Sequence, residues 1–277
     1  MVESIKKLRE VCYAGDNDKR PWYMENVTMK FSIYITWLFL HTPITANQVT
    51  IAEIFIVVLG SILMFFGNLW YILIGILLIH FTIILDNVDG EIARYRKKGS
   101  LVGMHLEDVY HQLVSYLMFF SLAFGIFLNT GWKSVMIFGF LCSVFSKSII
   151  IPNMFSAIIK NKLYGKTPID YLKKQEDKKA HRKEINLQGS KMGKTLSKVY
   201  NKLANFWAAP FNIVHLTIIS IMEVVNLNYQ FVPSYIIFYC YLVIYGVIVV
   251  LIQAISFIVH YKGRAAEQYY KSLFGDN

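Results

Sequence analysis

The stretch LWYILIGILLIHFTIILD, residues 69–86, decides the fold class, because it is a long apolar run that ends in a carboxylate. A helix of about 20 mainly apolar residues is long enough to cross the hydrocarbon core of a bilayer. The chain contains further runs of this kind, and we predict one membrane-spanning helix for each. The predicted spans are 48–66, 69–86, 105–128, 134–155, 206–225 and 235–260. The sequence therefore predicts an all-α, polytopic membrane protein with six transmembrane helices.

The composition supports this fold class. Hydrophobic residues make up 55% of the chain and charged residues only 17%, whereas about a quarter of the residues in soluble domains are charged. The three cysteines are far apart in the sequence, and they form neither a disulfide framework nor a metal-ligand spacing. The first 30 residues are polar and charged, which is not typical of a cleavable signal peptide, so insertion into the membrane is expected to come from the internal spans.

We expect three parts along the chain. Residues 1–47 form an N-terminal cytoplasmic and interfacial segment, in which the apolar stretch 31–40 is too short to span and should lie at the membrane interface as an amphipathic helix. Residues 48–260 form the six-helix catalytic domain, including a basic cytoplasmic linker at 156–205 with thirteen Lys and Arg. Residues 261–277 form a cytoplasmic tail.

Basic residues are distributed unevenly over the predicted loops. With six spans both termini lie on one side, and the three loops on the other side hold one basic residue, Lys133. Loops rich in Lys and Arg normally face the cytoplasm, so we predict cytoplasmic termini in a membrane expected to be that of a prokaryotic cell. The same distribution explains the net charge of +10 without a nucleic-acid partner.

Acidic residues gather where the second and third predicted spans meet. Asp86 and Asp89 are three residues apart and share one helix face, and Glu107 and His111 are four apart and share a face of the next helix. The short turn between the helices makes them antiparallel neighbours, so the two faces can converge. Carboxylates inside a helix bundle mark functional sites, and oxygen ligands suit Mg²⁺ or Mn²⁺. These four residues are the candidate metal ligands.

Small residues and one arginine flank this cluster. Gly90, Ala93 and Gly103 allow a flat ligand or a second backbone to come close. Arg94 offers a planar, permanently charged fork that suits phosphate. The four residues are candidate binding residues for a ligand that carries a pyrophosphate.

This segment resembles the signature of the CDP-alcohol phosphotransferase family, D-x2-D-G-x2-A-R-x8-G-x3-D-x3-D. Six positions match in type and spacing: Asp86, Asp89, Gly90, Ala93, Arg94 and Gly103. The last two aspartates of the signature are replaced by Glu107 and His111, which indicates a divergent member. The signature covers about 26 residues, and the six-span layout with a cytoplasmic site is also similar to that of the family.

The resemblance implies an enzyme that moves a phosphoalcohol group from a CDP-linked donor, such as CDP-diacylglycerol, to a small or lipidic alcohol and releases CMP. The segment TPITANQVT at 42–50 is similar to the family's element before the first span, which makes Asn47 a candidate nucleotide-binding residue. In the family the first three aspartates bind metal and the fourth is the usual base. His111 is therefore implied as the base, with Asp89 and Arg94 as further catalytic residues. Contact with membrane lipids and a homodimer are also expected.

Four positions keep alternatives open. His111 is either the base, with an unperturbed pKa near 6.5 that suits neutral pH, or a metal ligand. Asp108 replaces Glu107 as a ligand if the helix is rotated by one residue, about 100°. Lys147, which lies inside a predicted span, either extends to the interface or forms an anion-binding site beside the cluster. Glu91 is expected to be solvated or paired with a cation.

Two other functions stay open at this stage. The replacements at Glu107 and His111 leave room for a protein that only binds or transports a cation or a nucleotide. A CDP-alcohol hydrolase would use water in place of the acceptor. The identity of the donor and the acceptor does not follow from the sequence.

Overall fold

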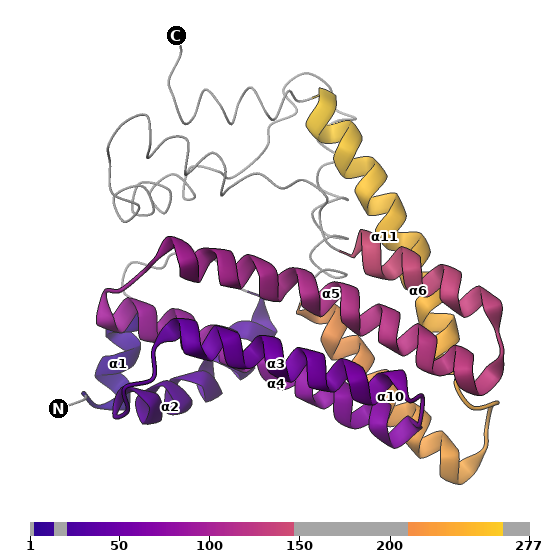
Figure 1. The fold of residues 1–277 in the computed structure, drawn as a ribbon, viewed down its shortest axis with the longest axis horizontal. Coiled ribbons are helices and arrows are strands. Elements are labelled where there is room, and N and C mark those ends of the chain that lie inside the picture. The colour runs from indigo at the N-terminus through magenta and orange to yellow at the C-terminus, as the bar shows by residue number, and fades with distance from the viewer. Residues whose placement is uncertain (1–2, 14–20, 147–209, 263–277) are drawn as a thin grey trace.

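The computed structural model describes residues 3–13, 21–146 and 210–262, and within these ranges the regular elements are helices, with no strand (Figure 1). Five of these helices are long and apolar enough to cross a membrane. They are α3 (Ala46–Phe65), α4 (Leu69–Arg96), α5 (Leu101–Thr130), α10 (Phe211–Tyr229) and α11 (Ile236–Lys262), the last through its part Ile236–Ile255. The predicted all-α, polytopic membrane fold is confirmed.

The fourth predicted span begins with a shorter apolar helix, α6 (Lys133–Phe145). The remainder of that predicted span, from residue 147 onward, lies outside the described residues. Lys147 and the basic linker 156–205 lie outside them as well. The predictions made for these two features therefore stay predictions.

Local capping sets where the helices around the acidic cluster begin. Thr45 caps α3 through a capping box, in which its side chain and that of Gln48 each bind the other residue's backbone N–H. The Asn68 side chain accepts hydrogen bonds from the first turn of α4, and Ser100 accepts one from the first turn of α5. The α4 helix ends at Lys97, whose left-handed φ of 51° reverses the chain towards α5. The short α4–α5 turn is therefore set by the left-handed residue at the C-terminus of α4 and by the N-cap of α5.

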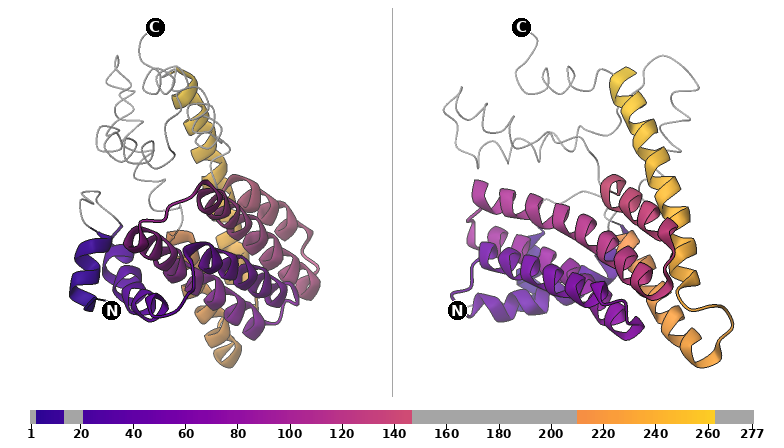
Figure 2. Two further views of the ribbon diagram at one scale, coloured as in Figure 1. Left: turned by 60° about the vertical axis from the view of Figure 1, so that its left-hand side comes forward. Right: turned by 45° about the vertical axis from the view of Figure 1, so that its right-hand side comes forward.

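The α3 helix packs along both α4 and α5, and α4 and α5 touch each other at few places. The close approach of α3 to α4 depends on two glycines, because a Cβ on Gly60 would lie 2.7 Å from the carbonyl oxygen of Gly75. Figures 1 and 2 show the three helices running side by side, with α6 and α11 packed beyond α5. The main apolar core joins these helices to α10. The start of α3, the end of α4 and the start of α5 therefore lie at one end of the bundle.

The N-terminal segment packs against the same end of the bundle. The helices α1 (Ile5–Cys12) and α2 (Met29–Leu40), the latter preceded by the π-helical turn η1 (Met24–Thr28), contact α4. The buried side of α2 carries Ser32 and Thr36, whereas Phe31 and Trp37 are exposed. The segment is therefore helical with an apolar outer side, which suits a membrane interface, and its position at that interface stays a prediction.

Candidate functional site

The structure brings together Asp86 from α4 with Glu107 and His111 from α5. One ligand atom of each lies within 4.8 Å of the others. Nε2 of His111 is 3.5 Å from Oδ1 of Asp86 and 3.9 Å from Oε1 of Glu107. The convergence expected from the i, i+3 and i, i+4 spacing is present for these three residues, whereas Asp89 is not in the group of converging ligand atoms. Two carboxylates and an imidazole form a donor set that a hard divalent cation can use.

Asp89 lies one turn after Asp86 on α4 and accepts a hydrogen bond from a third helix, α3. Oγ1 of Thr50, on α3, donates a hydrogen bond of 2.5 Å to Oδ2 of Asp89. A hydroxyl donor holds a carboxylate in one orientation, as hydrogen bonds to metal-binding carboxylates commonly do. The first helix of the bundle therefore contributes directly to the orientation of the motif, a contact that the signature alone did not predict.

The alternative ligand Asp108 does not join the cluster. Asp108 and Glu107 are both exposed, but among the described residues the group of converging ligand atoms contains Glu107 and not Asp108. A rotation of α5 by one residue is therefore not needed to bring an acid from this helix to the site.

The two candidate nucleotide-binding elements meet at the start of their helices. A Cβ on Gly103, in the first turn of α5, would lie 2.9 Å from Oδ1 of Asn47 in the first turn of α3. The N–H of Gly103 is bound at 3.0 Å by Oγ of Ser100. Because Gly103 has no side chain, Asn47 can approach the α5 backbone closely, which places the segment 42–50 beside the motif.

The Arg94 side chain extends along α4 towards its N-terminus and lies over Gly90. A Cβ on Gly90 would be 3.0 Å from Nη1 of Arg94, and the guanidinium carbon is 5.7 Å from the centre of the Tyr13 ring. Arg94 is exposed and Ala93 is half-buried. The arginine fork is therefore held over the part of α4 where the motif has only small side chains, and it remains open to an anionic ligand.

Glu91 was expected to be solvated or paired with a cation, and the first of these alternatives was wrong. Its side chain is fully buried, and it accepts hydrogen bonds of 2.5 Å from Ser32 and from Thr36 and a further one from Tyr13. Glu91 is buried because α1 and α2 pack on the face of α4 opposite the aspartates. The motif spacing shows only that Glu91 points away from those aspartates, and it contains no information about what covers that face.

Glu53 is a residue that the motif analysis missed. It lies two turns into α3 and is fully buried. The available signal was that it is the one acidic residue in the predicted span 48–66, and an ionisable side chain in a span is a functional candidate by default.

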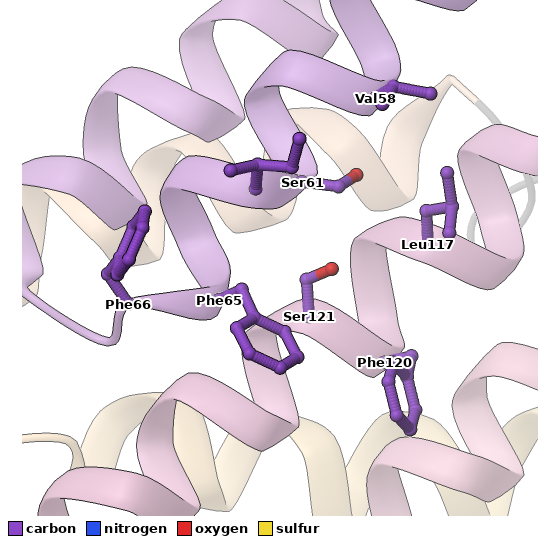
Figure 3. Close-up of a pocket in the computed structure, with 8 residues that line it drawn as sticks. Val58, Ser61, Phe65, Phe66, Leu117, Phe120 and Ser121 are labelled. Atoms are coloured by element: carbon purple, nitrogen blue, oxygen red, sulfur yellow. The ribbon is translucent and has the colours of Figure 1, made fainter.

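An apolar pocket of about 360 Å³ opens between α3 and α5 towards the other end of α3. Figure 3 shows Ser61 and Ser121 at the space between the two helices, with Phe65 and Phe120 beside them. None of the lining residues is charged. The pocket is therefore not the place of phosphate chemistry, and its lining suits hydrocarbon.

Comparison with known families supports the interpretation of the motif. Residues 43–175 match the family model described as CDP-alcohol phosphatidyltransferase, and this range contains every site residue discussed above from Asn47 to His111. No curated protein matches the chain. Residues 43–175, just under half of the chain, therefore form a CDP-alcohol phosphatidyltransferase domain.

Proposed function

We propose that the protein is a metal-dependent enzyme that transfers a phosphatidyl group from a CDP-linked lipid donor to a hydroxyl acceptor and releases CMP. Family membership supports transfer from a CDP-alcohol in general. The observation that carries the finer proposal is the convergence of Asp86, Glu107 and His111 within 4.8 Å inside the segment that matches the family.

The donor set fits Mg²⁺ or Mn²⁺. Asp86, Asp89 and Glu107 would hold the cation, since hard cations prefer carboxylate oxygens and Mg²⁺ commonly combines a few carboxylates with substrate phosphates. When bound, a divalent cation supplies charge neutralisation at the pyrophosphate of the donor. The family is divalent-cation dependent in general, which agrees with this assignment.

The remaining residues bind and orient the donor. Asn47, Gly90, Ala93 and Gly103 surround the space proposed for the cytidine nucleotide, and the small side chains among them keep it open. Arg94, exposed above Gly90, is proposed to bind the phosphates through its planar fork. Lys147 stays a candidate anion-binding residue outside the described part of the chain.

His111 is proposed to accept the proton. Its side chain is 39% exposed, so an acceptor hydroxyl can reach it. The hydroxyl oxygen attacks the β-phosphorus, a new P–O bond to the acceptor forms, and the P–O bond to CMP breaks. The hydroxyl proton goes to Nε2 or Nδ1 of His111, and CMP leaves with the electron pair of the broken bond.

A lipid-linked donor agrees with the apolar pocket between α3 and α5. Its lining residues, which include Val58, Phe65 and Leu117, offer an acyl chain an environment without charge (Figure 3). The cytoplasmic position of the site and the homodimer stay predictions from the charge distribution and from the family.

The test is CMP release from the purified protein in lipid or detergent, with CDP-diacylglycerol, Mg²⁺ or Mn²⁺ and a pool of polar alcohols. We expect metal-dependent CMP release that EDTA and Asp89→Asn abolish, together with a new phosphodiester product. Release of phosphatidic acid without a phosphodiester would indicate hydrolysis. If neither CDP-diacylglycerol nor soluble CDP-alcohols give CMP, the protein is a binding or transport protein and the proposal is wrong.

A further inference from the structure

Glu53 differs from the other fully buried glutamates that the structure describes. Glu91 accepts three hydrogen bonds from side-chain hydroxyls, and Glu223 accepts three from backbone N–H groups at the start of α11. Both carboxyl oxygens of Glu53 are buried without a hydrogen-bond partner in the described parts of the chain. A buried carboxyl group without a hydrogen-bond partner costs free energy of folding. A ligand bound to the Glu53 oxygens would offset this cost.

The position of Glu53 indicates which ligand. Thr50, one turn earlier on the same face of α3, donates to Asp89, and α3 packs against both helices that carry the acidic cluster. The charges that act most on Glu53 are those of Asp89, Asp86 and Glu107. Glu53 therefore lies on the helix that contacts the site, and the charges that act on it are those of the three proposed carboxylate ligands.

We propose that Glu53 is a further ligand of the divalent cation, on the buried side of the site. This inference rests on the metal site of the proposed function and adds to it a residue from outside the signature. Four acidic side chains gathered at one end of a helix bundle repel one another, and a cation between them would remove the repulsion and give the unpartnered oxygens of Glu53 a partner. The additional carboxylate also restores the charge that is absent at position 111, where this chain has histidine.

Burial separates this role from that of a base. The Glu53 side chain is 0% exposed, so an acceptor hydroxyl has no route to it. His111 is 39% exposed at the outer side of the cluster. A ligand behind the cation can be fully buried, whereas a group that takes a proton from an incoming substrate has to be reached.

The experiment measures Mn²⁺ binding to the full chain in lipid nanodiscs by electron paramagnetic resonance of free Mn²⁺. We expect Glu53→Gln to weaken Mn²⁺ binding at least about tenfold, as loss of even an indirect supporter of a metal site commonly does. Glu91→Gln is the matched control, because it makes the same change at an equally buried glutamate whose partners are hydroxyls. Its Mn²⁺ affinity should stay within about twofold of the wild type, since it touches no ligand.

Thermal unfolding gives a second readout. A metal ligand and a purely structural glutamate predict opposite changes in the melting temperature measured in EDTA. In EDTA, Glu53→Gln should melt at or above the wild-type temperature, because the variant removes repulsion, and it should lose most of the upward shift that Mn²⁺ produces. A purely structural glutamate would give a lower melting temperature and an unchanged Mn²⁺ shift. Glu91→Gln should melt lower and keep the shift.

The outcomes separate the two proposals. No Mn²⁺ binding to the wild-type protein would overturn the metal site itself, whereas wild-type binding that Glu53→Gln leaves intact would overturn only the role of Glu53. If Glu53→Gln does not fold, Glu53→Asp decides. It keeps the charge and withdraws the oxygens by one methylene, so a ligand role predicts weaker Mn²⁺ binding and unchanged binding contradicts it.

Discussion

Replacing Glu91 with alanine should loosen the N-terminal helices from α4 while leaving the acidic cluster in place. The Glu91 carboxylate is the shared acceptor of Tyr13 on the α1 side and of Ser32 and Thr36 on α2. Alanine removes that acceptor and leaves three hydroxyl donors at a packed interface. The aspartates of the motif lie on the opposite face of the same helix, so they keep their neighbours.

The size of the effect follows from the number of donors. A buried donor left without an acceptor costs roughly 1–3 kcal/mol, so three of them set an upper range near 9 kcal/mol. Tyr13 is only half-buried and can turn towards water. Ser32 and Thr36 are fully buried and carry most of the loss, and the share of Ser32 is reduced because its hydroxyl also lies 3.4 Å from the Met29 carbonyl oxygen. We therefore expect Glu91→Ala to lower the free energy of unfolding by about 3–5 kcal/mol, and Glu91→Gln to lower it by less, because the amide oxygen still accepts.

Unfolding with a denaturing detergent measures this loss, and hydrogen exchange locates it. Exchange in Glu91→Ala should rise in residues 5–12 and 29–40 and remain at the wild-type level around His111. The matched control is Ser61→Ala, a buried hydroxyl that has no hydrogen-bond partner among the described residues, and it should cost little. A loss below about 1 kcal/mol for Glu91→Ala would refute the reasoning, as would equal exchange in both regions.

Three other outcomes are expected. His111→Ala should lower the rate of CMP release at least about 100-fold, in the range that general acid–base catalysis contributes. His111→Asp, which restores the family pattern, should retain part of the activity. Equal losses in the two variants would contradict the proposed role of His111 as the base. Burial, together with the negative charge of Glu91, raises the pKa of Cys12 from 9.0 to about 11. Its thiolate fraction at pH 8 should therefore be about 100-fold below that of an ordinary thiol, and its alkylation rate should fall by the same factor. Mass spectrometry of labelled peptides measures this rate. Gly60→Leu should destabilise the protein by roughly 1–3 kcal/mol or more, because its Cβ would meet the Gly75 carbonyl oxygen at 2.7 Å, and a wild-type melting temperature would contradict this.

The acidic cluster could be predicted because its geometry is local. Asp86 and Asp89 share a face by spacing, Glu107 and His111 share another, and a turn of a few residues joins the helices. The face sharing within each helix depends on the helical period alone, whereas the convergence of the two faces also depends on how the helices pack. The distances of 3.5 and 3.9 Å around His111 agree with the expected convergence.

The environment of Glu91 and the role of α3 could not be predicted in the same way, because both depend on contacts between distant parts of the chain. Ser32 and Thr36 lie more than 50 residues before Glu91, and no pattern within α4 shows that α2 covers it. The short turn indicated direct neighbours, whereas α4 and α5 make few contacts and α3 packs against both. Small residues such as Gly60 and Gly75 allow this packing, and their partner is visible only in three dimensions.

The arrangement of α3 suggests why the last two positions of the signature could change. Asn47, Thr50 and Glu53 lie on successive turns of α3, and they face in turn the Gly103 backbone, Asp89 and the acidic cluster. If Glu53 is a ligand, the negative charge that the family signature has at position 111 is supplied in this chain from α3. A metal site depends on which oxygens converge and not on which helix carries them. On this view, histidine at position 111 is tolerated only together with Glu53, so His111→Asp should partly restore Mn²⁺ affinity to Glu53→Gln. Failure of that double variant to bind Mn²⁺ more tightly than Glu53→Gln would contradict the compensation.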